Sequence, residues 1–283
     1  MSLNSVNTNM GAMVALQSLE STQQELAVTQ KQISTGYRVA DSTDDGAAYA
    51  IAQGIRSTVG ALTSANQQLG TVTGLLSTTQ SGLNNISNTM ASMRDVLVKL
   101  SDSSVQGDER TNYTQQYQSL LANVQTFVQD ADYNGKTLIG DLTGSTGTFG
   151  RVAVARNENG SSYGITSFSG SAIYGSIAFT STQLAGASTV AALITATGTF
   201  LNQQAAVGQD LNTVGSSINY INNQTTYNSD KIDALNSGLG SLVDADLAQE
   251  SAQLTALQIR QQLGTQALSL ANQAPQSLLS LFK

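Results

Sequence analysis

The chain has 283 residues and a net charge of −7, and only 11% of its residues are charged, against about 25% in an ordinary soluble domain. This acidity, without any cluster of Lys or Arg, argues against nucleic acid as a partner. Cysteine and histidine are both absent, which removes the common nucleophile, general base and metal ligands. We therefore expect no enzyme, no cofactor and no metal site. No apolar run approaches the ~20 residues that span a bilayer, so we expect no membrane insertion.

The first predicted element is a helix over about residues 3–34, which Gly36 and a polar stretch after it interrupt. The polar stretch begins like a calcium-binding loop, but the carboxylate required at its twelfth position would fall on Ala52. We therefore expect Asp44 or Asp45 to cap the next helix instead of binding a metal.

A long second helix is predicted over about residues 46–103, and a third over about 108–131. Within the second helix, apolar residues follow a three-then-four spacing that repeats every seven residues, broken once by Thr79. This ladder consists of Leu69, Val72, Leu76, Thr79, Leu83, Ile86, Met90, Met93, Leu97 and Leu100. Such a narrow seam has to meet another helix, so it predicts a long helical bundle.

The composition shifts to Gly, Ser and Thr between about residues 137 and 183. We predict a strand over Arg151–Ala155, a turn over residues 157–160 and a returning strand over Ser162–Ile165. Ile173–Thr180 is predicted to be a further strand.

Helical spacing resumes over about residues 188–236. A second ladder runs through it and consists of Val207, Leu211, Val214, Ile218, Ile221, Thr225, Asn228, Ile232, Leu235, Leu239 and Leu242. Gly238 and Gly240 predict a break before a final helix over about 243–273, which Pro275 and an apolar tail follow.

These elements predict a mainly α fold. We expect an elongated antiparallel helical bundle or coiled coil that both termini form, with a small central β-hairpin region. The predicted segments are 1–45 for the first terminal helix and its connector, 46–136 for long helices, 137–187 for the β-rich segment, 188–240 for the returning long helix and 241–283 for the last terminal helix. A rod of this kind favours a structural protein.

The two terminal helices carry more apolar surface than a single partner helix of similar build covers, which indicates an interaction surface. We predict that these ends are disordered or aggregation-prone alone and become ordered only among copies of the same chain. The predicted assembly residues are Leu3, Val6, Met10, Met13, Leu19, Leu26, Ile33, Leu257, Ile259, Leu263, Leu270, Leu278, Leu281 and Phe282. Arg38 and Arg260 are isolated charges, and two roles stay open for them: a solvated surface residue, or an ion pair with a carboxylate of another copy.

Several stretches of the chain resemble bacterial flagellins, and those near the C-terminus are the most specific. They are Val6–Asn9 with Gly11–Met13, Ile33–Val39, Asp44–Ala48, Asp132–Leu138, Asp244–Ser251, Gln261–Gly264 and Ala271–Ala274. The turn at Tyr133-Asn134-Gly135 is similar to the family's phenylalanine-asparagine-glycine turn, with tyrosine in the aromatic place. The resemblance covers about residues 1–140 and 190–283.

This resemblance implies a structural subunit that self-polymerises into the flagellar filament for motility. It places the terminal helices around an inner channel, the long helices in the surrounding layer and the β segment outside. It also implies that the stretch with Asp44 and Asp45 connects the two layers and touches a neighbouring subunit.

The resemblance implies partners and a location as well. The partners are other copies in a helical filament, the flagellar export apparatus with an export chaperone, the filament cap, the hook-associated proteins and other flagellins. The location is extracellular, reached without a cleaved signal peptide. One alternative is the hook–filament junction protein, a hook-associated relative with the same terminal helices. A rival from another class is a helical signalling or needle-type secretion protein.

Overall fold

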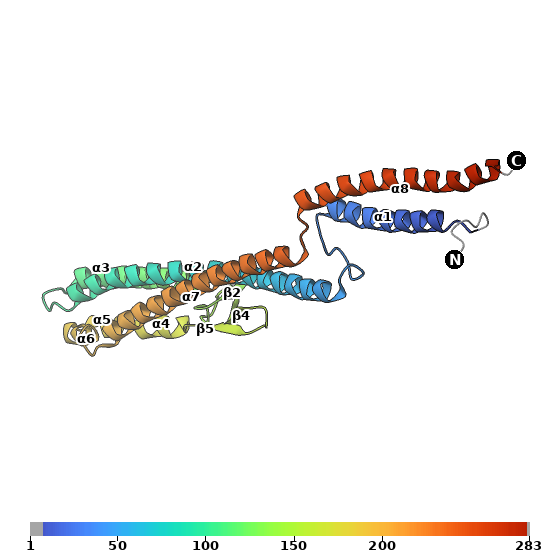
Figure 1. Ribbon diagram of the computed structural model, residues 1–283. Coiled ribbons are helices and arrows are strands. Elements are labelled where there is room, and N and C mark those ends of the chain that lie inside the picture. The colour runs from blue at the N-terminus through green and yellow to red at the C-terminus, as the bar shows by residue number, and fades with distance from the viewer. Residues whose placement is uncertain (1–7, 282–283) are drawn as a thin grey trace. The chain divides into compact units, whose positions relative to one another are not determined.

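The computed structural model describes residues 8–281, with side chains as far as Gln273. The described chain divides into two compact units (Figure 1). One unit contains the residues up to Ser57 together with those from Asp233 onward, and the other is Thr58–Ile232. Two long helices, α2 (Gly46–Leu100) and α7 (Thr199–Val243), contribute to both units.

The first unit contains a helical hairpin of α1 (Met10–Thr35) and α8 (Leu247–Leu281). Asn9 caps α1 by accepting a hydrogen bond from the backbone N–H of Ala12, and Gly36 ends it in the left-handed conformation, with φ 74°. The side chain of Asn9 donates to the carbonyl of Ala271, while the N–H of Ala245 donates to the carbonyl of Gly36. The two helices are therefore antiparallel, as Figure 1 shows.

The second unit is built on α2, α7 and α3 (Gly107–Gln129). The predicted ladder on α2 is confirmed, because every one of its ten members is buried. Thr79 breaks the apolar pattern, but its buried hydroxyl has a hydrogen-bond partner because it donates to the carbonyl of Leu75 at 2.8 Å. From Val207 to Asn228 the ladder on α7 alternates buried and half-buried residues, and its members from Val207 to Ile221 share the same core. Leu239 and Leu242 pack instead against the small core of the first unit.

Five short strands follow α3. The first three, β1 (Asp132–Tyr133), β2 (Lys136–Thr137) and β3 (Thr148–Phe149), form one small sheet. Asn134 and Gly135 both have positive φ, 51° and 74°, which is the geometry of a tight hairpin turn.

The predicted hairpin further along the chain is also confirmed. The strands β4 (Val152–Ala155) and β5 (Ser162–Ile165) pair antiparallel, with Ala155 opposite Ser162.

The prediction of a strand over residues 173–180 is wrong. This part of the chain forms α4 (Gly170–Ile177), followed by α5 (Ser181–Ala185) and α6 (Ala187–Leu193). Ser169 caps α4 by accepting from the N–H of Ala172, and Ile173 and Ile177, four residues apart, are both buried. The segment predicted to be β-rich is therefore helical in its second half.

The predicted break at Gly238 and Gly240 is also wrong. Helix α7 continues through both glycines to Val243, which packs with Val39 and Ala48 in a small core of the first unit. The break falls at Asp244–Asp246, and α8 runs on past Pro275 rather than ending near residue 273.

Candidate interaction surface

The seam of the α1–α8 hairpin combines leucine and isoleucine with small and hydroxyl side chains. As far as Thr29, the α1 positions with reduced exposure follow the seven-residue repeat, and they are Ala12, Ala15, Leu19, Thr22, Leu26 and Thr29; in the last turn Lys31, Gln32 and Ile33 are all half-buried. The buried residues among them are Thr22 and Thr29. The hydroxyl of Thr22 donates a hydrogen bond to the carbonyl of Ser18. On α8, Gly264 lies against Leu19: a Cβ built there would lie 3.3 Å from the side chain of Leu19.

Nine further large apolar side chains among the described residues of the hairpin lie outside this seam and face water in the single chain. They are between 46% and 64% exposed, and they are Met10, Met13, Val14, Leu16, Val28, Leu247, Ile259, Leu263 and Leu270. We call this set the outer apolar face. Large apolar side chains exposed in this number mark an interaction site.

The predicted assembly residues fall into three groups. Met10, Met13, Ile259, Leu263 and Leu270 belong to the outer apolar face. Four others pack within the hairpin itself, half-buried or buried: Leu19, Leu26, Ile33 and Leu257. The remaining five are not described, either as whole residues (Leu3, Val6 and Phe282) or in their side chains (Leu278 and Leu281).

Sequence reasoning missed four members of the outer apolar face. Val14, Leu16, Val28 and Leu247 do not share the three-then-four spacing of the seam, so a search for one stripe passes over them. A helical projection that counts every large apolar residue outside the seam would have found them.

The connectors of the first unit are tied to each other by backbone hydrogen bonds. The N–H groups of Arg38 and Val39 donate to the carbonyl of Val243, and Tyr37 pairs with Asp244 as an isolated β-bridge. The guanidinium of Arg38 donates to the carbonyl of Leu242 at 2.6 Å. Arg38 is thus exposed but engaged within its own chain, a role that the sequence did not suggest.

Lys31 holds the polar stretch of the first connector. Its ammonium group pairs with Asp41 at 2.8 Å and with Asp44 at 2.7 Å. The hydrogen bond from Lys31 holds the pKa of both carboxyl groups below their ordinary range, and the two carboxylates raise the pKa of Lys31. Asp45 caps α2, as predicted, by accepting from the N–H groups of residues 47 and 48. Arg260 lies 4.0 Å from Glu25, and both side chains are mostly exposed.

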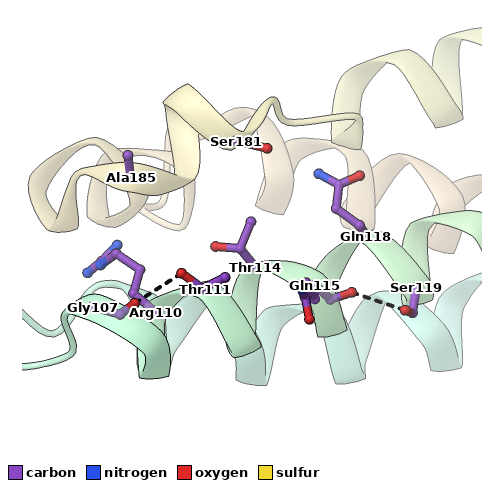
Figure 2. A pocket seen from close by; sticks show the side chains of 9 residues that line it. All are labelled: Gly107, Arg110, Thr111, Thr114, Gln115, Gln118, Ser119, Ser181 and Ala185. Carbon is purple, nitrogen blue, oxygen red and sulfur yellow. Dashed lines mark hydrogen bonds between the residues drawn. The ribbon is translucent and has the colours of Figure 1, made fainter.

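A cavity of about 720 Å³ lies in the second unit beside α3 and α5 (Figure 2). Hydroxyl and amide side chains line most of it. Arg110 is at its edge, but its guanidinium donates to the carbonyls of Leu100, Val105 and Leu184, so it closes helix ends rather than facing a ligand. The cavity therefore presents uncharged polar groups and no reactive one.

Within residues 8–281, no three Asp or Glu side chains gather as a metal site. No helix in the same range is long and apolar enough to cross a membrane.

The long helical seams and the outer apolar face define a helical structural protein. Family comparisons agree: a model of the bacterial flagellin N-terminal helical region matches residues 6–143, and one of the C-terminal helical region matches residues 194–282. Flagellin FljM of Caulobacter vibrioides is 32% identical over all of both chains. A flagellin of Brucella melitensis is 33% identical over 99% of each chain. The chain belongs to the bacterial flagellin family and is a self-polymerising subunit of the flagellar filament.

A solved structure from Vibrio parahaemolyticus, described as a flagellar hook-associated protein, shares the fold. It has a TM-score of 0.60 and 14% identity, and the match covers 71% of this chain and all of that one. At this identity the likeness concerns the fold alone. It does not favour the hook–filament junction alternative over the filament subunit.

Proposed function

We propose that the outer apolar face of the α1–α8 hairpin is the surface through which copies of this flagellin join the filament. The observation that carries the proposal is a surplus of large apolar side chains: Leu19, Leu26 and Leu257 already pack in the hairpin's own seam, yet nine further leucine, isoleucine, valine and methionine side chains of the described hairpin face water. Burial of these side chains between copies would contribute about 25 cal/mol per Å² of apolar surface.

The low charge of the hairpin supports the same role. Between residues 8 and 30, α1 carries two carboxylates, Glu20 and Glu25, and no cation. The one cation on α8, within residues 247–281, is Arg260. Few ions would have to be desolvated when such surfaces meet. The exposed pair of Arg260 and Glu25 could exchange partners between copies and so fix their register.

The remaining partners are part of the proposal. We expect export through the flagellar apparatus with a chaperone, to an extracellular filament that also contacts cap and hook-associated proteins, and a purely structural role. Copolymerisation with other flagellins is supported by Caulobacter vibrioides, where three flagellins, FljM, FljK and FljO, are 31–32% identical to this chain.

A double substitution, Leu263→Gln with Leu270→Gln, tests the surface. The two positions are seven residues apart on one face of α8, and glutamine is a good helix former, so the monomer should keep its helix content and thermal midpoint. We expect no elongation from filament seeds by electron microscopy. The matched control is Val98→Gln on α2, where the valine is 52% exposed, and it should elongate normally. Normal filaments from the double variant would overturn the proposal.

A further inference from the structure

Asn228 is the one fully buried amide in the ladder of α7. It is 0% exposed, and its side chain joins three elements. Its Nδ2 donates to Oδ1 of Asn66 on α2 at 2.8 Å and to the carbonyl of Arg156, just after β4, at 3.0 Å. Its Oδ1 accepts from Nε2 of Gln224 on α7 at 2.9 Å. The amide is therefore satisfied mainly by groups from other parts of the chain.

Thr79, the other polar member of the two ladders that is fully buried, behaves differently. Its hydroxyl bonds to the carbonyl of Leu75 one turn back in the same helix, so it stays satisfied wherever α2 lies along α7. Asn228 depends on Asn66, which meets it in one axial register only. A buried asparagine in an otherwise apolar seam is a known means of fixing register.

The seam needs such a device because its apolar pattern repeats every seven residues. A slip of α2 against α7 by one repeat, about 10 Å, would again place apolar residues opposite apolar residues. In the slipped arrangements Asn228 would face the position of Val59 or of Thr73. Valine has no polar group, and the hydroxyl of Thr73 is bonded to its own helix at the carbonyl of Leu69.

A slipped register would thus leave a buried amide without its partner on α2. The penalty for an unsatisfied buried polar group corresponds to roughly ten- to a hundred-fold in population. That factor is large enough for one register to dominate, even where the apolar contacts alone would give registers of nearly equal free energy.

The β4–β5 hairpin is linked to the same register, because it contacts α7 on both sides of Asn228. Lys231 forms an ion pair with Glu158 in the hairpin turn. Tyr163 of β5 stacks on Tyr220, with ring centroids 4.0 Å apart, and its hydroxyl donates to Oγ of Ser217. The hairpin is therefore held along α7, and the hydrogen bonds of Asn228 to Arg156 and Asn66 connect it to α2.

We propose that Asn228 determines the axial register of α2 against α7 and couples that register to the docking of the β4–β5 hairpin. In a helical polymer of identical copies, each subunit has to present its contact surfaces at the same spacing. One buried amide that rejects every slipped arrangement supplies this uniformity.

The test is Asn228→Leu, which completes the apolar seam and should leave the protein folded. Because the chain has no cysteine, spin labels can be attached at Gln67→Cys on α2 and Thr226→Cys on α7, two exposed positions near the Asn66–Asn228 contact. With Asn228 present we expect one narrow distance distribution. With Asn228→Leu we expect a second or broadened distribution from slips of about 10 Å, and amide exchange in residues 152–165 at least ten-fold faster.

Two further variants separate register from general damage. Thr79→Val is the matched control: it also removes a buried polar group from the seam, and it should keep the single distance. Asn66→Ala removes the α2 acceptor without altering α7, so it should broaden the distance while the hairpin stays protected through Arg156. A single unchanged distance distribution in both Asn228→Leu and Asn66→Ala would overturn the proposal, whatever happens to the hairpin.

Discussion

Shortening Leu263 and Leu270 to alanine should raise the subunit concentration that filament growth requires by about 100-fold. Each substitution deletes three carbons, worth about 2.4 kcal/mol on full burial at about 0.8 kcal/mol per carbon. The two leucines are 64% and 60% exposed in the single chain, so about 1.5 kcal/mol per leucine is still available to be gained on assembly. The pair sums to about 3 kcal/mol, and every 1.4 kcal/mol is a factor of ten.

The measurement is the critical concentration, taken as the subunit left in the supernatant after seeded assembly and sedimentation. Alanine keeps helix propensity high, so the thermal midpoint of the monomer should not fall. Leu257→Ala is an instructive contrast, because Leu257 is buried inside the hairpin. It should lower the hairpin's own stability by about 2–5 kcal/mol. A critical concentration for the double variant within two-fold of the unmodified protein would refute the reasoning.

Two other predictions concern the interior and the connector. Tyr117→Phe removes a buried hydroxyl that donates to the carbonyl of Ile177 at 2.7 Å, and it should lower the free energy of unfolding by about 1–3 kcal/mol; an unchanged denaturant midpoint would contradict this. Because Lys31 lowers the pKa of Asp41 and Asp44, the stabilisation is present above the ordinary carboxyl range near pH 4 and is lost as pH falls through their lowered values. The raised pKa of Lys31 keeps the pair charged until strongly alkaline pH. Amide exchange in residues 36–45, relative to intrinsic rates, should therefore increase in acid, and Lys31→Met should abolish that dependence; a connector equally protected at pH 2 and pH 6 would count against it.

The long helices could be predicted from sequence because their seams repeat over many turns. Leu83, Met90 and Leu97 are spaced by seven and are all buried in the second unit, so each reinforces the same interpretation. A pattern of this length has no strand alternative, since strands place successive residues on opposite faces.

The errors arose where the local signal was short. Ile173–Thr180 is an apolar run that periodicity cannot assign, and the cap at Ser169 decides it in favour of a helix. Gly238 and Gly240 are poor helix formers, but Val243 beyond them packs against Val39. Tertiary packing thus outweighs a cost of about 1 kcal/mol per glycine.

The sequence predicted that the terminal helices carry an interaction surface, but it did not predict which apolar residues form that surface and which pack inside the hairpin. The sequence shows that the terminal helices have a surplus of apolar residues, yet it does not say which of them face the partner helix. Thr22 and Thr29 look like ordinary polar positions, and their burial against α8 follows only from the contact between the two helices. Leu257 and Leu263 are both leucines of the same helix, yet Leu257 is buried and Leu263 is exposed.

The same seven-residue spacing has different consequences in the two units, because the hairpin carries more large apolar side chains than its seam covers. In the second unit, Leu, Ile and Met fill the seam, so these apolar side chains are buried within one chain. In the α1–α8 hairpin, leucines such as Leu19 and Leu257 share the seam with Thr22, Thr29 and Gly264, and further large apolar side chains remain outside it. Folding and assembly therefore draw on different residues: Met90 should affect monomer stability, whereas Leu263 should affect polymer stability alone.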